Sequence, residues 1–168
     1  MRESREETMR EAKGFRPVRT ADGSWTFFSE EYQETMHSVS GAWEESLKKF
    51  AEPACVREFA KRGSIRILDV GFGTGLNTAA ALHLALGENP QADILVVGLE
   101  KENFQETIRE MKVPAREFEI VQNKAEFVPL DRALVKQLLS PANGVKISVV
   151  MEDATLSARV LLEEGADG

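Results

Sequence analysis

The sequence contains a single cysteine, Cys55, among its 168 residues. One cysteine forms no internal disulfide and supplies no cysteine-rich metal site, so the simplest interpretation is a metal-free protein of a reducing compartment. We expect Cys55 to be a small buried hydrophobic residue rather than a catalytic thiol. The sequence also lacks an apolar run near ~20 residues and a charged-then-apolar amino-terminal signal. These absences favour a cytoplasmic protein without a membrane span.

Positive charge is scarce as well. The chain has 21 Lys and Arg residues against 28 Asp and Glu residues, which gives a formal net charge of -7 at pH 7. Residues 1–66 are balanced, so the acidic excess lies in residues 67–168. Phosphate contacts supply much of the affinity of nucleic-acid-binding proteins, so composition alone predicts no nucleic-acid surface. The length and the hydrophobic content of 42% are those of one ordinary globular domain.

What the sequence does contain is a strand, a glycine turn and a helix in succession. The β-branched, apolar run 65–70 predicts a buried parallel strand. Gly71, Gly73 and Gly75 follow at every second position and predict a tight turn whose backbone a ligand can approach. The apolar stretch after Gly75 predicts a helix whose first N–H groups face the same ligand. Together these features predict a cofactor loop.

The spacing of the glycines distinguishes between two cofactors. A dinucleotide site needs glycine at the first, third and sixth positions, whereas the sixth position here is Leu76. The pattern Gly-Phe-Gly-Thr-Gly, with Asp69 before it, resembles motif I of the class I S-adenosylmethionine-dependent methyltransferases. Asp69 is expected to accept a hydrogen bond from a cationic amino group or to support the turn. A nicotinamide-dependent oxidoreductase is the weaker alternative.

The other segments predict the rest of an α/β fold. An Asp-Gly pair between strand-like runs 15–20 and 25–29 predicts a hairpin, with Pro17 confining the first run to an edge. Further strands are expected at 94–99, 147–151 and, less distinctly, 118–121. A helix is expected to begin with Ser29 as its N-cap. Other helices are expected at 43–50, 76–86 with Gly87 as C′, 101–112, 132–139 and 154–164, whereas residues 1–13 predict a frayed helix or a disordered tail.

Two groups of side chains have both a structural and a functional interpretation. Glu100 follows the apolar strand 94–99 about one βαβ step beyond the glycine turn, where an acid can accept both ribose hydroxyls. The alternative is an ordinary charge at a strand end. The aromatic residues Trp25, Phe27 and Phe28 are expected to cover a small core rather than to stack on a base. His83, within helix 76–86, is expected to be structural.

One segment carries a more specific resemblance. The run from Thr20 to Tyr32, Thr-Ala-Asp-Gly-Ser-Trp-Thr-Phe-Phe-Ser-Glu-Glu-Tyr, is followed by Glu34, His37 and Ser38, and it resembles the amino-terminal signature of the methyltransferase family of the MnmC type. The resemblance implies the α/β sheet of a class I S-adenosylmethionine-dependent methyltransferase, Rossmann-like, with an amino-terminal hairpin–helix cap. It also implies methyl transfer to the amine of 5-aminomethyl-2-thiouridine at the tRNA wobble position, with tRNA as the partner of the complete protein.

The resemblance implies roles for individual residues too. S-adenosyl-L-methionine is expected to bind Asp69, Gly71, Phe72, Gly73, Thr74, Gly75, Asn77, Glu100, Lys101, Asp153 and Ala154. The substrate is expected to contact Tyr32, Glu34 and His37. Asp153 would accept a hydrogen bond from the adenine amine. The alternative for Asp153, the N-cap of helix 154–164, is compatible with that role.

Against this family the chain stops before the fourth strand of the sheet. The catalytic acid is therefore expected beyond Gly168, the catalytic residue is unknown, and this fragment is expected to be inactive. The expected division is a tail at 1–14, the cap at 15–62 and the first half of the methyltransferase domain at 63–168. Strand 65–70 would then be an uncovered apolar edge that self-associates. The competing class is a non-catalytic binding or association module.

Overall fold

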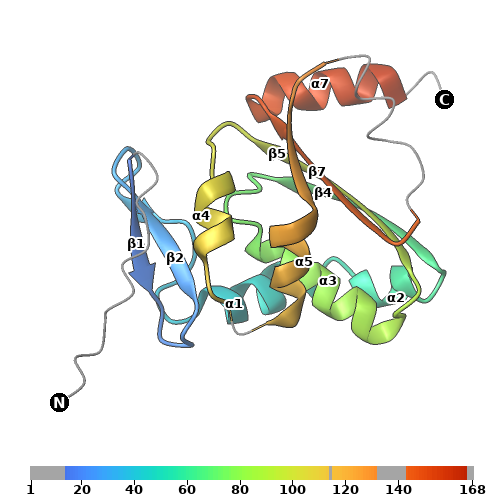
Figure 1. Ribbon diagram of the computed structural model, residues 1–168, viewed down its shortest axis with the longest axis horizontal. Helices are drawn as coiled ribbons and strands as arrows, with labels where there is room; N and C mark the ends of the chain where they lie inside the picture. Colours follow the sequence, from blue (N-terminus) through green and yellow to red (C-terminus); the bar gives the residue numbers. More distant parts are fainter. Residues whose placement is uncertain (1–13, 114, 132–142, 166–168) are drawn as a thin grey trace.

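The computed structural model describes residues 14–113, 115–131 and 143–165. Two sheets are present among these residues (Figure 1). A three-stranded antiparallel sheet forms the amino-terminal cap, and a four-stranded parallel sheet with helices on both faces forms an α/β unit. The predicted α/β fold class is thus confirmed. The tail 1–13 and the helix predicted at 132–139 lie outside the described residues.

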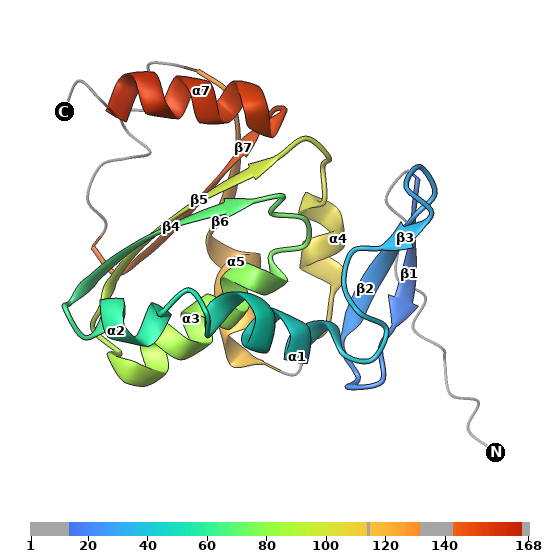
Figure 2. The ribbon, with the colours of Figure 1, turned by 180° about the vertical axis from the view of Figure 1, so that it is seen from behind.

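The elements follow the chain in this order: β1 (Phe15–Arg19), β2 (Trp25–Ser29), β3 (Glu34–Thr35), α1 (Ala42–Glu45), the π-helix η1 (Ser46–Ala51), α2 (Val56–Ala60), β4 (Ser64–Val70), α3 (Leu76–Glu88), β5 (Asp93–Glu100), α4 (Gln105–Glu110), α5 (Arg116–Lys124), β6 (Ala125–Pro129), β7 (Val145–Met151) and α7 (Ala154–Gly165). The helices α1, η1 and α2 run from the cap along α3 (Figure 2).

The parallel sheet has the strand order β4-β5-β7-β6. Its inner strand β5 is apolar from Ile94 to Leu99, as expected of a strand buried on both faces. Alternate side chains divide between the two faces: Ile94 and Val96 pack in the core on the side of α3 and α5, whereas Leu95 and Val97 pack beneath α7. This arrangement brings the carboxyl ends of β4 and β5 side by side, where α/β sheets bind ligands.

The strand β4 is an edge of the parallel sheet. Among the described strands it pairs only with β5, and Leu68 and Val70 on its α7-side face are 57% and 61% exposed. Their partners across the sheet, Val97 and Leu99, are buried. The exposed apolar edge predicted for this strand is therefore confirmed. An uncovered apolar edge offers free backbone groups and apolar side chains to another strand.

We expect the 168-residue chain to self-associate through β4. Replacing both Leu68 and Val70 with lysine should shift the protein to a monomer, because charged side chains on an edge strand oppose pairing with another chain. Leu162→Lys, at a 74% exposed position on α7, is the matched control and should leave the association unchanged. Size-exclusion chromatography with light scattering measures the mass. A wild-type chain that stays monomeric over a wide range of concentration would contradict this prediction.

The cap packs against the α/β unit through aromatic rings. Phe27, which is fully buried on β2, and Phe15 on β1 both meet the ring of Phe104, with centroid distances of 6.3 and 4.9 Å. This packing agrees with the prediction that the aromatic residues of the hairpin cover a core. The hairpin itself and the edge position of β1, which contains Pro17, are also confirmed.

Three predictions about local structure were wrong. No helix begins at Ser29, because Ser29 ends β2 and pairs with Glu34 of β3 across a turn in which Gln33 is left-handed, with φ 56°. Residues 118–121 form part of the helix α5 and not a strand, since Phe118 and Val121 reach the core at a helical spacing of three. The helix α3 continues through Gly87 to Glu88.

Two further features differ from expectation. Cys55 is exposed and left-handed, with φ 55°, at the turn that enters α2, so it is not a buried hydrophobic residue. The strand β6, Ala125–Pro129, was not predicted, because its five residues carry little β-branched or alternating pattern. It forms the edge of the parallel sheet opposite β4.

Candidate functional site

The predicted strand, glycine turn and helix form the centre of the site. The backbone of Gly71, Gly73 and Gly75 takes positive φ values of 72°, 53° and 78°, which glycine adopts at little cost. The N–H groups of Gly71 and Phe72 both donate to the carbonyl of Leu99, at 2.9 and 3.1 Å. These bonds hold the turn against the carboxyl end of β5, so the ends of two strands and the start of α3 meet at one place.

Glu100 lies at this junction and is almost fully buried, with 9% exposure. Its Oε2 accepts a hydrogen bond from the N–H of Gly73 at 2.7 Å, and its Oε1 accepts from the N–H groups of Lys101 and Glu102, both at 2.9 Å. Glu100 is therefore not an ordinary solvated charge at a strand end. It binds the glycine turn directly, and its contact with a ribose stays a prediction.

Asp69 is buried behind the same turn. Its Oδ2 accepts a hydrogen bond from the Thr78 hydroxyl at 2.6 Å, which joins the end of β4 to α3. Burial raises the pKa of Asp69 to about 6, and the negative charge of Glu100 contributes to the rise while the bond to Thr78 opposes it. No cationic side chain is among the groups that set this pKa. Asp69 is thus buried next to the carboxylate of Glu100, with no positive charge among the groups that set its pKa.

The residues between the glycines contribute unequally. Phe72 is 3% exposed and its ring meets Phe127 edge-on at 6.2 Å, so its side chain belongs to the core. Thr74 is likewise buried. A Cβ placed on Gly73 would lie 2.5 Å from the Cε atom of Met36, which shows that the cap covers the turn at this point.

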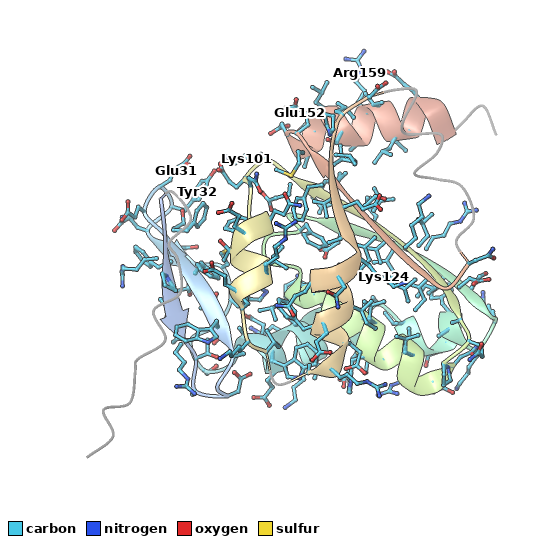
Figure 3. The ribbon with its side chains drawn as sticks, in the orientation of Figure 1. Glu31, Tyr32, Lys101, Lys124, Glu152 and Arg159 are labelled. Atoms are coloured by element: carbon cyan, nitrogen blue, oxygen red, sulfur yellow. The ribbon has the colours of Figure 1, made fainter. Side chains whose placement is uncertain are left out.

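The side chains of Lys101 and Tyr32 meet at the rim of the site (Figure 3). Lys101 was predicted to bind the cofactor and Tyr32 to bind the substrate. The Lys101 ammonium donates to the Tyr32 hydroxyl at 3.1 Å and lies 5.6 Å from the ring centroid. The Tyr32 hydroxyl and the charge of nearby Glu31 raise the pKa of Lys101. The turn between β2 and β3 therefore reaches the carboxyl end of β5.

Glu34 and His37 line an open pocket of about 450 Å³ beside the glycine turn. Its other lining residues are Phe28, Gln33, Thr35, Met36, Ser38 and Glu45. His37 is connected to the turn through Asn77, whose side chain lies close enough to raise the pKa of His37, while burial lowers it more strongly. The pocket thus brings two predicted substrate residues together and leaves Tyr32 outside its lining. It also adds Glu45, which no sequence motif indicated.

Asp153 has the geometry of a helix N-cap. Its Oδ1 accepts a hydrogen bond from the N–H of Thr155 at 2.9 Å, and this bond lowers the pKa of Asp153. The preceding Glu152 donates its N–H to the carbonyl of Glu100 at 3.0 Å, so the tip that holds Asp153 and Ala154 lies next to Glu100. The N-cap interpretation is confirmed, and an adenine contact stays a prediction.

The second histidine lies away from this site. Nδ1 of His83 is 3.1 Å from a carboxylate oxygen of Glu117, and the ring meets Trp43 edge-on at 5.9 Å, in agreement with a structural role. Within residues 14–113, 115–131 and 143–165, no group of three or more His, Cys, Asp or Glu side chains could hold a metal ion. None of the helices in the same ranges combines the length and apolarity that crossing a membrane requires.

Comparison with known proteins identifies relatives that are longer than this chain. No protein-family model matches it. It is 36% identical over 107 residues to the uncharacterized protein MJ0670 of Methanocaldococcus jannaschii, a match that covers 64% of this chain and 28% of that protein. It is also similar to the crystal structure of MnmC2 from Aquifex aeolicus, with a TM-score of 0.68, 32% identity, and coverage of 89% of this chain and 45% of that one. The chain therefore shares the α/β fold of MnmC2 over less than half of that protein's length.

Proposed function

We propose that this chain holds the S-adenosylmethionine-binding part of a tRNA-modifying methyltransferase of the MnmC type. The observation that carries the proposal is the pair of buried carboxyl groups, Asp69 and Glu100, next to the glycine turn. The likeness to MnmC2 and the amino-terminal signature from Thr20 to Ser38 support the same conclusion.

The acid pair selects the charge of the ligand. Like charges in a buried site repel, and a cation placed between them favours their ionised form. S-adenosylmethionine carries a sulfonium and an ammonium group, which suit this site. The pyrophosphate of a nicotinamide dinucleotide is an anion and would add to the repulsion. Together with Leu76 at the position of the third glycine, this argues against an oxidoreductase.

The residues present fit the cofactor at several points. Glu100, which accepts a hydrogen bond from Gly73, retains lone pairs for ribose hydroxyls. Lys101, Asp153 and Ala154 would lie toward the adenine end. When bound, the cofactor supplies an electrophilic methyl group.

The remaining chemistry concerns the acceptor. The proposed acceptor is the primary amine of 5-aminomethyl-2-thiouridine at the wobble position of tRNA, which attacks only as the neutral amine. The protein must hold the nitrogen in line with the methyl group and favour loss of the ammonium proton. The activity, the substrate and the tRNA contacts belong to the proposal for the whole protein, because the chain spans 45% of its solved relative.

Titration calorimetry tests the proposal. We expect S-adenosylmethionine to bind with release of protons near pH 6, because the incoming cation lowers the pKa of Asp69, which burial raises to about 6. Comparing two buffers of different ionisation enthalpy measures the released protons, and NAD is the matched competitor. Tighter binding of NAD than of S-adenosylmethionine would favour the oxidoreductase and overturn the proposal.

A further inference from the structure

The pocket between β3 and α1 has a polar floor that the cofactor does not explain. It borders the glycine turn in two ways, since Met36 lies over Gly73 and His37 lies next to Asn77. Its wall carries two carboxylates, Glu34 from β3 and Glu45 from α1. A pocket with this charge, open to solvent and contiguous with the turn, is suited to a small cationic group that must approach a bound cofactor.

His37 is the unusual residue of this pocket. Its backbone N–H donates to the Thr26 hydroxyl at 2.9 Å, which orients the residue, but its Nδ1 is buried without a hydrogen-bond partner. Oδ1 of Asn77, next to His37, is also buried without a hydrogen-bond partner. The two side chains suit each other if the neutral ring keeps its proton on Nδ1, facing the amide oxygen. Nε2 is then the free proton acceptor of His37.

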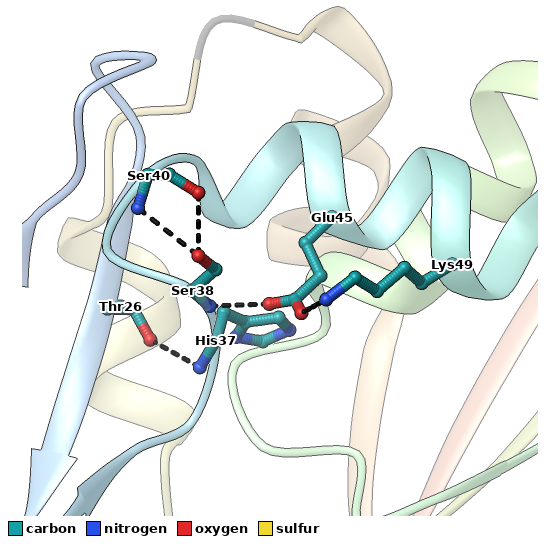
Figure 4. Close-up of polar contacts among 6 residues, drawn as sticks. All are labelled: Thr26, His37, Ser38, Ser40, Glu45 and Lys49. Carbon is teal, nitrogen blue, oxygen red and sulfur yellow. Dashed lines mark hydrogen bonds and ion pairs between the residues drawn. The ribbon is translucent and has the colours of Figure 1, made fainter.

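Glu45 lies beside the ring and is held in place from two sides (Figure 4). Oε2 accepts a hydrogen bond from the N–H of Ser38, and Oε1 accepts from Lys49 Nζ at 2.7 Å. The negative charge of Glu45 raises the pKa of His37, whereas burial lowers it and dominates. The ring is therefore neutral at neutral pH, next to a carboxylate that favours its protonated form. A negative charge beside a histidine favours the imidazolium that forms when the ring accepts a proton.

We propose that this pocket binds the primary ammonium group of the substrate and that His37 accepts its proton, with the negative charge of Glu45 favouring the protonated ring. The proposal rests on the proposed function for the identity of the amine, but its site is distinct from the acid pair at the glycine turn. Glu34 adds negative charge on the wall of the pocket and contributes to attracting the cation.

The proton and electron balance is simple. The N–H bond of the ammonium breaks, its electron pair stays on nitrogen, and the proton moves to Nε2 of His37, where Glu45 stabilises the imidazolium. The neutral amine would then use its lone pair to form the N–C bond with the methyl group that bound S-adenosylmethionine would supply, and the electrons of the methyl–sulfur bond would remain on sulfur. The product is a secondary ammonium ion, and His37 returns its proton to water.

NMR of the imidazole rings tests this inference without a methylation assay, because the chain has only two histidines. The probe is 5-aminomethyluridine, and uridine is the matched nucleoside without the amine. We expect 5-aminomethyluridine to shift the His37 signals and uridine to leave them unchanged. His83, which does not line the pocket and packs against Trp43 and Glu117, should report no change. Equal effects of the two nucleosides, or no change at His37, would overturn the inference.

Two neighbouring glutamates on α1 provide matched variants. Glu45→Gln should weaken binding of 5-aminomethyluridine roughly tenfold and lower the pKa of His37 further, because a hydrogen-bonded negative charge is removed. Glu44→Gln breaks the other i,i+4 pair with a lysine, that with Lys48, in which the glutamate is more exposed, and it should leave both quantities unchanged. Glu34→Gln, which removes a charge from the wall of the pocket, gives a second test of charge if Glu45→Gln is unstable. Identical behaviour of Glu45→Gln and Glu44→Gln would contradict the role of Glu45.

Binding of S-adenosylhomocysteine separates this inference from the proposed function. If S-adenosylhomocysteine binds and 5-aminomethyluridine leaves His37 unaffected, the base assignment fails and the cofactor site stands. If S-adenosylhomocysteine does not bind while the amine still shifts His37 in the wild type, the methyltransferase proposal fails and the ammonium pocket stands.

Discussion

Replacing Glu100 with glutamine is expected to weaken binding of S-adenosylhomocysteine by about ten- to a hundredfold. The Glu100 carboxylate accepts hydrogen bonds from three backbone N–H groups, those of Gly73, Lys101 and Glu102. A glutamine amide has one acceptor oxygen, so its NH₂ group must face at least one of these donors. Each charge-assisted hydrogen bond contributes roughly 1.5–3 kcal/mol, and the same group is expected to bind the ribose.

Titration calorimetry with S-adenosylhomocysteine measures the effect of Glu100→Gln. Glu106→Gln is the matched control, because Glu106 is exposed on α4. This variant should bind S-adenosylhomocysteine with wild-type affinity. Hydrogen exchange gives an independent measurement, since loss of the bond from Gly73 should speed exchange in the glycine turn. Wild-type affinity in Glu100→Gln would remove the carboxylate from the cofactor site and with it a main support of the methyltransferase proposal.

Asp69→Asn is expected to stabilise the ligand-free chain above pH 6. Burial raises the folded-state pKa of Asp69 from 3.8 to about 6, so between these values the folded protein holds a proton that the unfolded chain has lost. The free energy of unfolding therefore falls as the pH rises through this window, by roughly 3 kcal/mol in total. Asparagine cannot ionise, and its amide oxygen can still accept the hydrogen bond from Thr78.

Urea unfolding at several pH values between 4 and 8 tests the prediction for Asp69→Asn. The free energy of unfolding of the variant should not decline between pH 4 and pH 6. Above pH 6 it should exceed that of the wild type by up to about 3 kcal/mol, whereas near pH 4 the two should be similar. Glu58→Gln, at an exposed position on α2, should keep the wild-type dependence. A variant that is less stable than the wild type at pH 7.5 would show that the Asp69 carboxylate is compensated by a charge. A site that is destabilised until its cation binds is consistent with the trade-off between stability and function.

Much of the site could be predicted because its elements are encoded over a few residues. Glycines at 71, 73 and 75 adopt positive φ at little cost because glycine has no Cβ atom. The apolar runs before and after them indicate a strand and a helix by their own periodicity. The position of Glu100 also follows from local order, since parallel strands joined by a helix end at the same edge of the sheet. These predictions required no knowledge of distant contacts.

Other features depend on which side chains meet after folding. The sequence around Ser29 has the residues of a helix start, but pairing of Ser29 with Glu34 satisfies the backbone in a strand instead. Tertiary packing likewise makes α5 from a segment with short strand character, because Phe118 and Val121 both reach the core. Local propensity contributes less free energy than burial and strand pairing. Where propensity disagrees with them, burial and strand pairing determine the structure.

The sequence by itself determined the strand–turn–helix unit, the inner strand β5 and the acids that follow the strands. Only the tertiary structure decided which groups share one site. The bond between Gly73 and Glu100 joins residues 27 apart in the chain, and that between Lys101 and Tyr32 joins residues 69 apart. The burial that raises the pKa of Asp69 and the placing of Glu45 beside His37 likewise arise from packing. Charge, desolvation and hydrogen bonding act over a few ångströms in space, a distance that sequence separation does not measure.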